Sequence, residues 1–429
     1  MSDSGGMFKQ PLKQSVQDLT LLKSHPQWGL ANKIYETLTA QGYQTYLAGG
    51  CVRDLLLGVR PSDIDIATAA TPSQVKKLFL KTIDVGENFG VTRVIENGQD
   101  IEVAVFRTDG DYQDGRHPET VVFSDPEHDA QRRDFTINAL FLDLQKNEVI
   151  DYVGGLKDLA LKIIKTVGPS EQRFQEDHLR VLRALRFSAQ LGFEIEGSTL
   201  SAVQKMKELL KKVSGERVRD EVLKLLKSWQ PHVGFELIIS TGIFEILFGK
   251  LPPESLSLWK KIFPLPSDLR SEIFWLGFFW PLLEAEAEGQ SSIPWNEIED
   301  QVKLSRVERK AFKSARDFLK KREHWQGQKL GEKILFMHQN VGPSLIAFTA
   351  LSFPAWASEF MNLKKEYERV APQGQLPEPY LKGQDVADLQ GPERGGALEA
   401  AYLEQLEGSV RSRGEALQWL TAYPKGLKK

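Results

Sequence analysis

The chain has a single cysteine, Cys51, and no run of about 18 apolar residues. One cysteine excludes an internal disulfide and a cysteine-based zinc site. The missing apolar run predicts no membrane-spanning helix. The first nine residues lack a hydrophobic signal region, which predicts a cytoplasmic protein. Cys51 follows two glycines, where a small packing residue is a simpler interpretation than a nucleophile.

A strong net charge is also lacking, because the formal charge is only −3 over 429 residues. Hydrophobic residues make up 41% and charged residues 26%, which is typical of an ordinary soluble globular protein. The length predicts two to four structural units. The near-neutral total argues only mildly against a nucleic-acid partner, since one basic stripe is enough to hold a phosphate backbone.

The stretch from Thr45 to Thr68 carries the first chemical pattern. It predicts a strand over 45–48, a turn at Gly49 and Gly50, a short helix over 52–57 and a second strand. A glycine turn before a helix offers backbone N–H groups to a phosphate.

The predicted second strand carries Asp63 and Asp65, with isoleucines in alternation. Side chains two apart in a strand share a face, so the two carboxylates lie together. Such a pair suits Mg²⁺, and with the glycine turn it indicates metal-assisted transfer from a nucleoside triphosphate. Glu102, in an alternating apolar strand over 101–106, is either a third carboxylate of this cluster or a surface-facing glutamate.

Two arginines, Arg132 and Arg133, precede another apolar run. Guanidinium groups bind phosphate bidentately, so a pair beside carboxylates suits a triphosphate, whereas elsewhere such a pair is usually solvated surface. The glycine-rich and charged stretch over 107–120 predicts a mobile loop.

Beyond Asp151 the pattern becomes helical, and the segment 176–193 predicts one helix closed by Gly192. Four charged residues recur at three-residue intervals along it: Asp177, Arg180, Arg183 and Arg186. An ordinary salt-bridged surface helix is the alternative interpretation.

Two later segments, 205–227 and 303–322, are basic. In the second, the residues predicted to form the buried face are Leu304, Val307, Ala311 and Phe318. A one-sided basic helix is either a track for a phosphate backbone or a solvated helix. The predicted division of the chain is a lead-in over 1–28, a head over 29–150, a neck over 151–215, a body over 216–340 and a tail over 341–429.

Five motifs occur in a fixed order: Leu47–Asp54, Asp63–Thr68, Arg132–Leu140, Asp151–Gly155 and Glu176–Phe187. Together they resemble the class II tRNA nucleotidyltransferases and the related bacterial poly(A) polymerases, of the DNA polymerase beta-like nucleotidyltransferase superfamily. The resemblance covers at least residues 43–247. It implies an α+β fold, in which a head with a mixed β-sheet is followed by an all-helical neck, body and tail.

The resemblance also implies roles for individual residues. Asp63 and Asp65 would hold Mg²⁺, with Glu102 as a third catalytic carboxylate. Asp177 and Arg180 would present acceptor and donor edges to the incoming base, in the manner of a Watson–Crick partner. The residues implied to bind nucleotide are Gly49, Gly50, Arg53, Arg132, Arg133, Asp134, Asn138, Asp177, Arg180, Arg183 and Arg186, and those of a flexible loop are Asp114 and Arg116.

The implied activity is the addition of C, C and A from CTP and ATP to the 3′ end of tRNA, whose acceptor and T arms would be the partner. Addition of A alone and poly(A) synthesis are the enzymatic alternatives, and an inactive RNA-binding module is the non-enzymatic one. The loop sequence Asp114–Pro118 is the family's usual one except that His117 stands where a second arginine is usual. The segment 85–94 lacks the basic run that marks the poly(A) polymerases.

Overall fold

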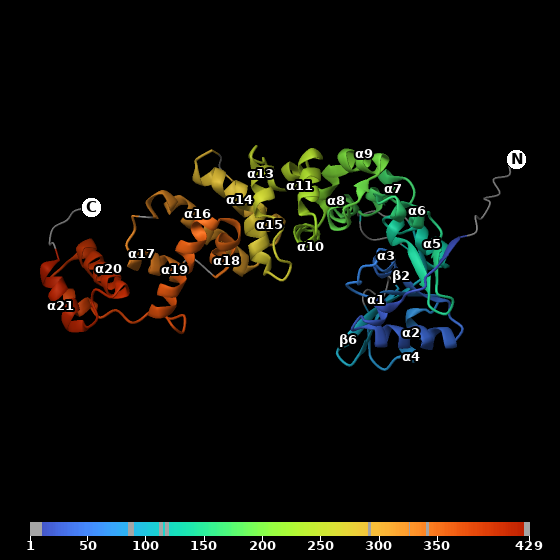
Figure 1. The fold of residues 1–429 in the computed structure, drawn as a ribbon, viewed down its shortest axis with the longest axis horizontal. Helices are drawn as coiled ribbons and strands as arrows, with labels where there is room; N and C mark the ends of the chain where they lie inside the picture. The colour runs from blue at the N-terminus through green and yellow to red at the C-terminus, as the bar shows by residue number, and fades with distance from the viewer. Residues whose placement is uncertain are drawn as a thin grey trace. The chain divides into compact units, whose positions relative to one another are not determined.

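The computed structural model describes residues 11–84, 90–110, 115, 120–290, 293–325, 327–339 and 343–423 (Figure 1). The chain divides into two compact units, Met1–Leu225 with Glu236–Leu247, and Leu226–Phe235 with Phe248–Lys429. The finer division into head, neck, body and tail stays a prediction.

The first unit is built on a sheet of eight strands within the described residues. Their order is β1–β10–β9–β2–β3–β6–β5–β4, and only the β3–β6 pair is parallel. This confirms the mixed sheet. The strands are β1 (Leu12–Ser15), β2 (Thr45–Ala48), β3 (Ile66–Thr68), β4 (Thr82–Asp84), β5 (Val91–Glu96), β6 (Gln99–Val105), β9 (Leu140–Asp143) and β10 (Glu148–Asp151).

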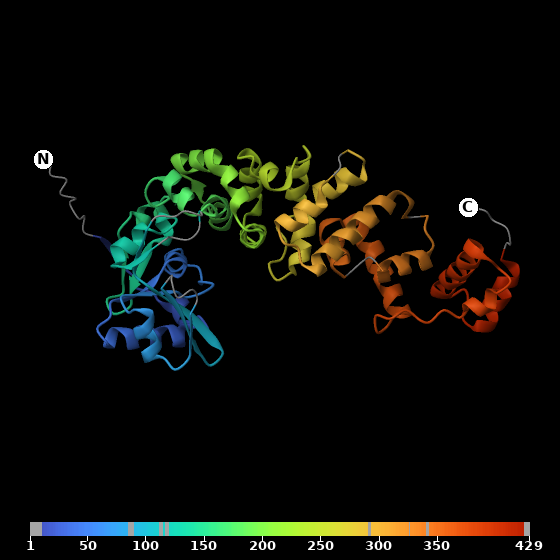
Figure 2. The same cartoon turned by 180° about the vertical axis from the view of Figure 1, so that it is seen from behind.

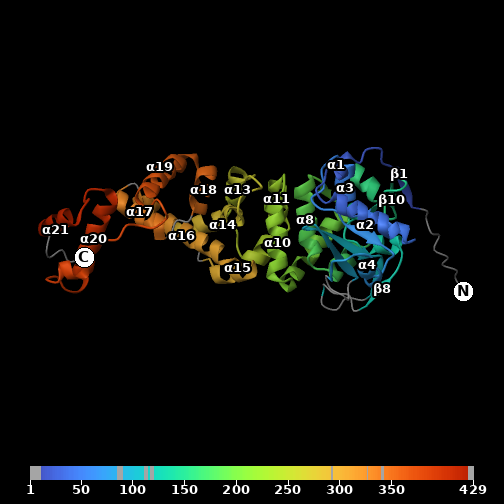
Figure 3. The same cartoon turned by 90° about the horizontal axis from the view of Figure 1, so that it is seen from below.

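Part of the expected loose lead-in is folded, because β1 forms one edge of the sheet. Leu12 to Ser15 pair antiparallel with Asp151 to Glu148 of β10 (Figure 3). The backbone hydrogen bonds of this edge hold a polar strand whose side chains are all exposed, so its hydrophobic pattern gave no signal.

The helices α2 (Trp28–Ala40) and α4 (Pro72–Leu78) lie side by side against the sheet (Figures 1 and 3). In α2 the apolar residues Leu30, Ile34 and Leu38 recur at helical spacing and are buried. A separate core cluster in this unit contains the aromatic rings of Tyr46, Phe106 and Phe141, with ring centres about 6 Å apart. The short elements around it are α1 (Thr20–Lys23), α3 (Gly50–Leu56), α5 (Pro126–Gln131) and η2 (Thr136–Asn138).

The segment expected to be a loop over 107–120 starts as a strand. β7 (Arg107–Asp109) pairs antiparallel with β8 (Val121–Phe123), so the two ends of the segment are joined by a ladder.

The prediction that the chain is helical after Asp151 is confirmed, and the structure adds one short pair of strands. The strands β11 (Ile163–Ile164) and β12 (Glu194–Ile195) form a short parallel pair. The helices here, from teal to green in Figure 2, are α6 (Gly155–Ala160), α7 (Ser170–Glu176), α8 (Arg180–Leu191), α9 (Gly197–Met206), η3 (Lys207–Lys212), α10 (Gly215–Leu226), α11 (Pro231–Ser240) and α12 (Ile243–Phe248).

The prediction of one helix over 176–193 is wrong at its start. α7 ends at Glu176, and α8 begins only at Arg180. Between them Asp177 has an extended backbone, with φ −137° and ψ 105°. Gly192 closes α8 in the left-handed conformation, as predicted.

The second unit is helical. Its α14 is almost wholly buried, and Phe278 of this helix stacks on Trp259 at 5.3 Å between ring centres. No helix of the described residues is long and apolar enough to cross a membrane. The helices are α13 (Ser255–Ile262), α14 (Ser271–Ala287), α15 (Trp295–Gln301), α16 (Arg306–Trp325), α17 (Leu330–Gln339), α18 (Pro343–Ser352), α19 (Pro354–Val370), η4 (Gly383–Val386), α20 (Gly391–Glu407) and α21 (Arg413–Ala422).

One of the four residues predicted to be buried in the basic segment 303–322 is exposed in the structure. Leu304, Ala311 and Phe318 are buried as expected, but Val307 is 57% exposed. The position expected for Val307 is taken by Glu308, whose carboxylate is buried and accepts hydrogen bonds from Ser271 Oγ and the Ser305 backbone N–H.

Candidate active site

The glycine turn joins β2 to α3 and needs glycine at its first position. Gly49 has φ +76° and ψ −129°, a conformation that L side chains rarely adopt. A Cβ atom on Gly49 would also lie 2.9 Å from Arg133 Nη1. The turn therefore places backbone directly against the side chain of Arg133, while Gly50 begins α3 beside Arg53.

The two predicted metal ligands lie just before β3 rather than within it, since the strand begins at Ile66. The alternation itself is present: Ile64 and Ile66 are each 1% exposed, whereas Asp63 is exposed and Asp65 half-buried. In the parallel pair, Ile66 is in register with Val103 of β6. This register brings Glu102 next to Asp65.

The carboxylates near Asp65 repel one another. Burial, and then the charges of Asp63 and Glu102, raise the pKa of Asp65 to about 7, against the opposing charge of Arg133. Hard oxygen donors with an uncompensated like-charge repulsion are a setting that a divalent cation relieves, so the residues present fit a metal.

The third carboxylate is less well placed than the pair. Glu102 accepts a hydrogen bond from Arg93 Nη2 at 2.7 Å, and the described residues hold no cluster of three or more His, Cys, Asp or Glu side chains suited to a metal ion. Asp63 and Asp65 are therefore the donors that fit, and the role of Glu102 stays a prediction.

The two neighbouring arginines share a buried anchor, Asp129, which is 1% exposed. Arg132 donates to Asp129 Oδ1 at 2.6 and 2.9 Å, and Arg133 donates to Asp129 Oδ2 at 3.0 and 3.1 Å. Arg133 also donates to the backbone carbonyl of Asn138 at 3.1 Å, whereas Arg132 lies 3.8 Å from Asp109. Only Arg133 therefore faces the glycine turn and Asp65.

A chain of buried polar contacts joins Arg53 of α3 to Arg183 of α8. Arg53 Nη1 donates to Asn138 Oδ1 at 2.6 Å, and Asn138 Nδ2 donates to Asp134 Oδ1 at 3.1 Å. Arg183 Nε donates to Asp134 Oδ2 at 2.8 Å. Burial favours the neutral carboxyl, but Arg183 and Arg180 outweigh it and hold the pKa of Asp134 well below its usual range.

Three guanidinium groups surround the ring of Phe187. The guanidinium carbons of Arg53, Arg183 and Arg186 lie 5.2, 5.3 and 3.7 Å from the ring centre. Cation–π contacts of this kind stabilise desolvated arginines. Arg53 is 4% and Arg186 6% exposed, so both pack inside the protein in this structure, and their roles in nucleotide binding stay predictions.

Asp177 lies at the break between α7 and α8. Its Oδ1 accepts a hydrogen bond from the Leu179 backbone N–H at 3.1 Å, and Arg217 of α10 contacts both carboxylate oxygens. The break matters because it takes Asp177 off the regular helical surface on which the predicted three-residue spacing had placed it.

Arg180 is 8% exposed and held on three sides. Its Nη1 donates to Glu176 Oε2 at 2.8 Å and to the carbonyl of Arg173 at 3.1 Å, and its Nη2 donates to the carbonyl of Arg132 at 3.0 Å. Arg180 thus lies against the Arg132–Arg133 segment. A pocket of about 160 Å³ adjoins it, lined in part by Asp109, Arg132 and Glu176.

The predicted loop residues Asp114 and Arg116, and the departure at His117, lie outside the described residues. Gly115, between them, is described. Its carbonyl accepts a hydrogen bond from the His178 backbone N–H at 3.2 Å, and a Cβ atom there would come within 2.5 Å of the His178 ring. Gly115 therefore contacts the residue after Asp177.

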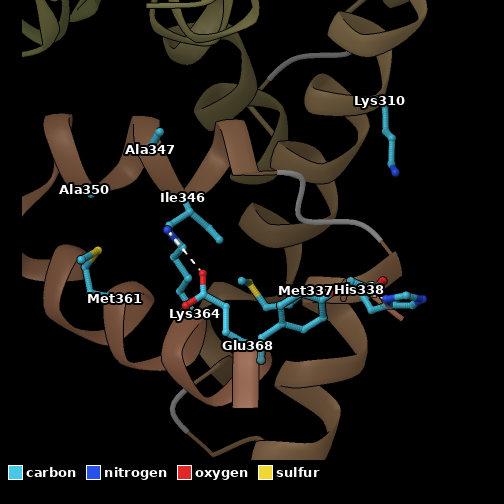
Figure 4. A pocket seen from close by; sticks show the side chains of 11 residues that line it. Lys310, Met337, His338, Ile346, Ala347, Ala350, Met361, Lys364 and Glu368 are labelled. Atoms are coloured by element: carbon cyan, nitrogen blue, oxygen red, sulfur yellow. Dashed lines mark hydrogen bonds and ion pairs between the residues drawn. The ribbon is translucent and has the colours of Figure 1, made fainter. Parts of the chain in front are cut away.

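A larger cavity, of about 410 Å³, lies in the second unit among α16, α17, α18 and α19. Figure 4 shows apolar side chains such as Met337 and Ile346 along it, with Lys364 paired to Glu368 at 3.6 Å. The lining holds one carboxylate, already paired, so it does not offer the acid pair seen near β3.

Sequence reasoning missed four residues that organise the site: Asp129, Phe187, Arg217 and Glu221. Signals existed for three of them. Asp129 precedes two arginines by three and four residues, and Arg217 and Glu221 are opposite charges one helical turn apart. Phe187 carried no signal beyond its place at the end of an arginine-rich run.

Two family models match the chain. "Poly A polymerase head domain" matches residues 45–165, and "Probable RNA and SrmB- binding site of polymerase A" matches residues 192–255.

Curated relatives are similar over about half of the chain. The CCA-adding enzyme of Bacillus pumilus is 48% identical over 217 residues, which cover 50% of this chain and 54% of that protein. The CCA-adding enzyme of Geobacillus kaustophilus is 44% identical over 52% of this chain and 55% of that protein. The chain thus matches about half the length of these curated relatives.

Solved structures are similar over nearly the whole chain. A Bacillus stearothermophilus CCA-adding enzyme in complex with CTP is 30% identical, with a TM-score of 0.70, over 93% of this chain and 98% of that one. A Thermotoga maritima CCA-adding enzyme complexed with tRNA is 21% identical, with a TM-score of 0.64, over 96% of this chain and 98% of that one, which shows the fold alone.

Proposed function

We propose that this chain, which belongs to the family of class II CCA-adding enzymes and bacterial poly(A) polymerases, adds C, C and A from CTP and ATP to the 3′ end of tRNA. The proposal places the enzyme in the cytoplasm. One observation carries it: the carboxylate pair and helix α8, which begins at the candidate base-reading residue Arg180, belong to a single unit and are connected by hydrogen bonds. Arg133, beside Asp65, donates to the carbonyl of Asn138, and the Asn138 amide leads through Asp134 to Arg183 of α8.

Members of this family normally use a divalent metal, and here Asp63 and Asp65 would hold Mg²⁺. When bound, Mg²⁺ supplies charge neutralisation for the triphosphate and acidifies the attacking hydroxyl. In the reaction, the 3′-oxygen of tRNA forms a bond to the α-phosphorus of the nucleotide, the bond to the β-phosphate oxygen breaks, and pyrophosphate leaves.

The chain's own residues would bind and orient the triphosphate. The Gly49 N–H already donates to the carbonyl of Leu140 at 3.0 Å, so the donor that this turn would offer is the N–H of Gly50 at the start of α3. Arg133 faces the same place with part of its guanidinium charge compensated by Asp129. Because Arg53 is buried in the contacts with Asn138, its role is to fix this wall of the site.

Asp177 and Arg180 would select the base. C and A each carry an exocyclic amine donor beside a ring-nitrogen acceptor, which matches a carboxylate acceptor beside a guanidinium donor. G and U present the inverse pattern, so a site built for the first pair leaves buried polar groups unpaired with the second.

The tRNA partner would be held by charge and shape. Helix α16 has two kinds of basic residue. Arg316 and Arg322 pair with glutamates of α14, whereas Lys310, Lys313 and Lys320 are exposed. The exposed lysines suit phosphate contacts, which position RNA without reading its sequence.

The test is incubation of the protein with tRNA that ends at the discriminator base, labelled CTP and ATP. Three added nucleotides in the order C, C, A are expected. Uptake of ATP without CTP would assign addition of A alone, and a long A tract would assign poly(A) synthesis. No incorporation by a protein that binds the tRNA would favour the inactive RNA-binding module.

A further inference from the structure

Helix α10 presents two charged side chains, one turn apart, to the charged residues of α8 and the segment before it. Arg217 Nη2 lies 3.0 Å from Asp177 Oδ1 and 2.8 Å from Asp177 Oδ2. Glu221, 3% exposed, accepts a hydrogen bond from Arg186 Nε at 2.5 Å and lies 3.6 Å from Arg183 Nη1.

We propose that Arg217 is a positioning residue that determines base selection by fixing the carboxylate of Asp177. This rests on the proposed function, since it assigns the residue that orients the base-reading acid. Glu221 does a different task on the same helix, because it compensates the two arginines that pack around Phe187.

Asp177 needs such a partner because of where it lies. It occupies the break between α7 and α8 as the C-cap of α7, where its backbone is extended and its N–H donates to the carbonyl of Arg173 at 3.3 Å. Besides the contacts with Arg217, the carboxylate of Asp177 accepts a hydrogen bond from the backbone N–H of Leu179 through Oδ1. A carboxylate held at one oxygen can rotate about its last side-chain bond, whereas contact with both oxygens fixes its plane.

Orientation is what discrimination requires. A carboxylate oxygen has more than one lone-pair direction, so one held by a guanidinium still accepts from a base amine. The side chains of Asp177 and Arg217 are 20% and 23% exposed, so this pair is accessible to a nucleotide. A carbonyl of G or U at the same place faces an oriented acceptor and is repelled, and a rotating carboxylate would weaken this penalty.

Arg217 reaches both oxygens through one nitrogen, Nη2. A lysine ammonium that reaches the same place can replace that single contact point, although it lacks the planar fork. The geometry therefore predicts partial rescue by Arg217→Lys, which a purely steric role of Arg217 would not give.

The experiment compares Arg217→Ala, Arg217→Lys and the control Asp220→Ala in the full chain, with tRNA ending at the discriminator base. Asp220 is exposed on the same helix. The measured quantities are kcat/KM for CTP and for UTP, and the melting temperature. Arg217→Ala is expected to lower the CTP-over-UTP ratio about tenfold, with a higher KM for CTP. Arg217→Lys is expected to recover part of that loss, and Asp220→Ala to match the wild type.

An unchanged CTP-over-UTP ratio in Arg217→Ala overturns the proposal, whether or not the overall rate falls. A fall in the ratio that Arg217→Lys does not recover at all, together with a lowered melting temperature in both variants, also overturns it, because the role is then structural. Failure of the proposed function is distinguishable, since the wild type itself would then not add C, C and A.

Discussion

The carboxylates before β3 and the carboxylate in the arginine network of α8 are opposites in their charge environment. Asp65 faces other acids, and burial and their charges raise its pKa to about 7. Asp134 faces Arg183 and Arg180, which lower its pKa despite its burial. In the first setting the negative charges repel one another, which a bound cation or a proton relieves, whereas in the second the carboxylate is already paired with arginines of the protein.

This difference in charge environment separates two groups of residues. Asp63 and Asp65 would meet the metal and the triphosphate, whereas Asp134 and its arginines hold the structure behind them. A site that binds a multiply charged ligand needs unsatisfied charge, which costs stability. A wall that has to hold its shape needs paired charge, because a buried unpaired ion is expensive. The two kinds of carboxylate should therefore respond in opposite ways to neutralisation.

The largest effect on activity is expected from neutralising the carboxylates of Asp63 and Asp65. Asp63→Asn with Asp65→Asn should lower nucleotide incorporation on the order of 10³-fold, since the donors for the metal are lost. tRNA binding, measured by filter retention, should be unchanged, and the melting temperature should not fall. Normal incorporation by this variant would show that the metal assignment is wrong.

Neutralising Asp134 should lower the stability of the protein, whereas neutralising Asp63 and Asp65 should not. Asp134→Asn leaves Arg183, whose side chain is 30% exposed and which lies 3.6 Å from Glu221, without its main partner, and should cost about 1–3 kcal/mol of unfolding free energy. Denaturant unfolding of this variant beside Asp65→Asn measures the contrast directly. Equal stability of the two variants would contradict the contrast in charge environment, because Asp65 and Asp134 would then be equally well paired in the folded protein.

The pH dependence of stability gives an independent measure. The pKa of Asp134 is lower in the folded protein than the unfolded value of about 3.9. Its contribution is therefore fully present above about pH 4 and is lost as the pH falls through the folded pKa. The stability difference between wild type and Asp134→Asn should be constant from pH 5 to 7 and shrink below pH 4, as followed by urea unfolding. A difference that does not shrink at low pH would refute the ion-pair explanation.

The sequence predicted the carboxylate pair before β3 well, but it predicted the contacts of Asp134 with the arginines of α8 poorly. Alternation around Asp63 and Asp65 predicted their shared face, because the period of an extended chain is local. The contact of Asp134 with Arg183 spans 49 residues, and no local period reports it. The break at Asp177 was missed for a related reason: helical propensity continues through it, while tertiary contacts with α10 favour the extended backbone.

In the fold, too, features with a local sequence pattern were predicted and features that depend on distant contacts were not. The change to helices after Asp151 was predicted from the sequence pattern, and the mixed sheet was implied by the resemblance that the five motifs carry. β1 was not, since its four side chains are all exposed and it is held by pairing with β10. Arg53 is implied by its motif to meet the nucleotide, which stays a prediction; its burial beside Phe187 is a tertiary contact that the motif alone does not reveal.

A smaller effect is expected at the turn that faces both settings. Gly49→Ala forces an unfavourable backbone and presses a Cβ atom against Arg133, so the KM for CTP should rise several-fold, with about 1–2 kcal/mol lost in stability. Gly58→Ala is the matched control, because Gly58 also has a positive φ but has nothing within 4 Å of a Cβ atom. If both variants raise the KM equally, backbone strain and not the contact with Arg133 is responsible.

The smallest effect is expected on α16, where the contrast between paired and unpaired charge recurs within one helix. Lys310→Gln with Lys313→Gln should weaken tRNA binding a few-fold and reduce the slope of log K against log salt by about 1 to 2, with stability unchanged. Arg316→Gln should instead lower stability, because it leaves Glu286 without a guanidinium that lies 2.8 Å away, and should leave the salt slope unchanged. Salt titrations of tRNA binding and thermal melts separate the two. A lowered salt slope in Arg316→Gln would show that the arginines contact RNA as well, and that pairing with glutamate does not remove a basic residue from the binding surface.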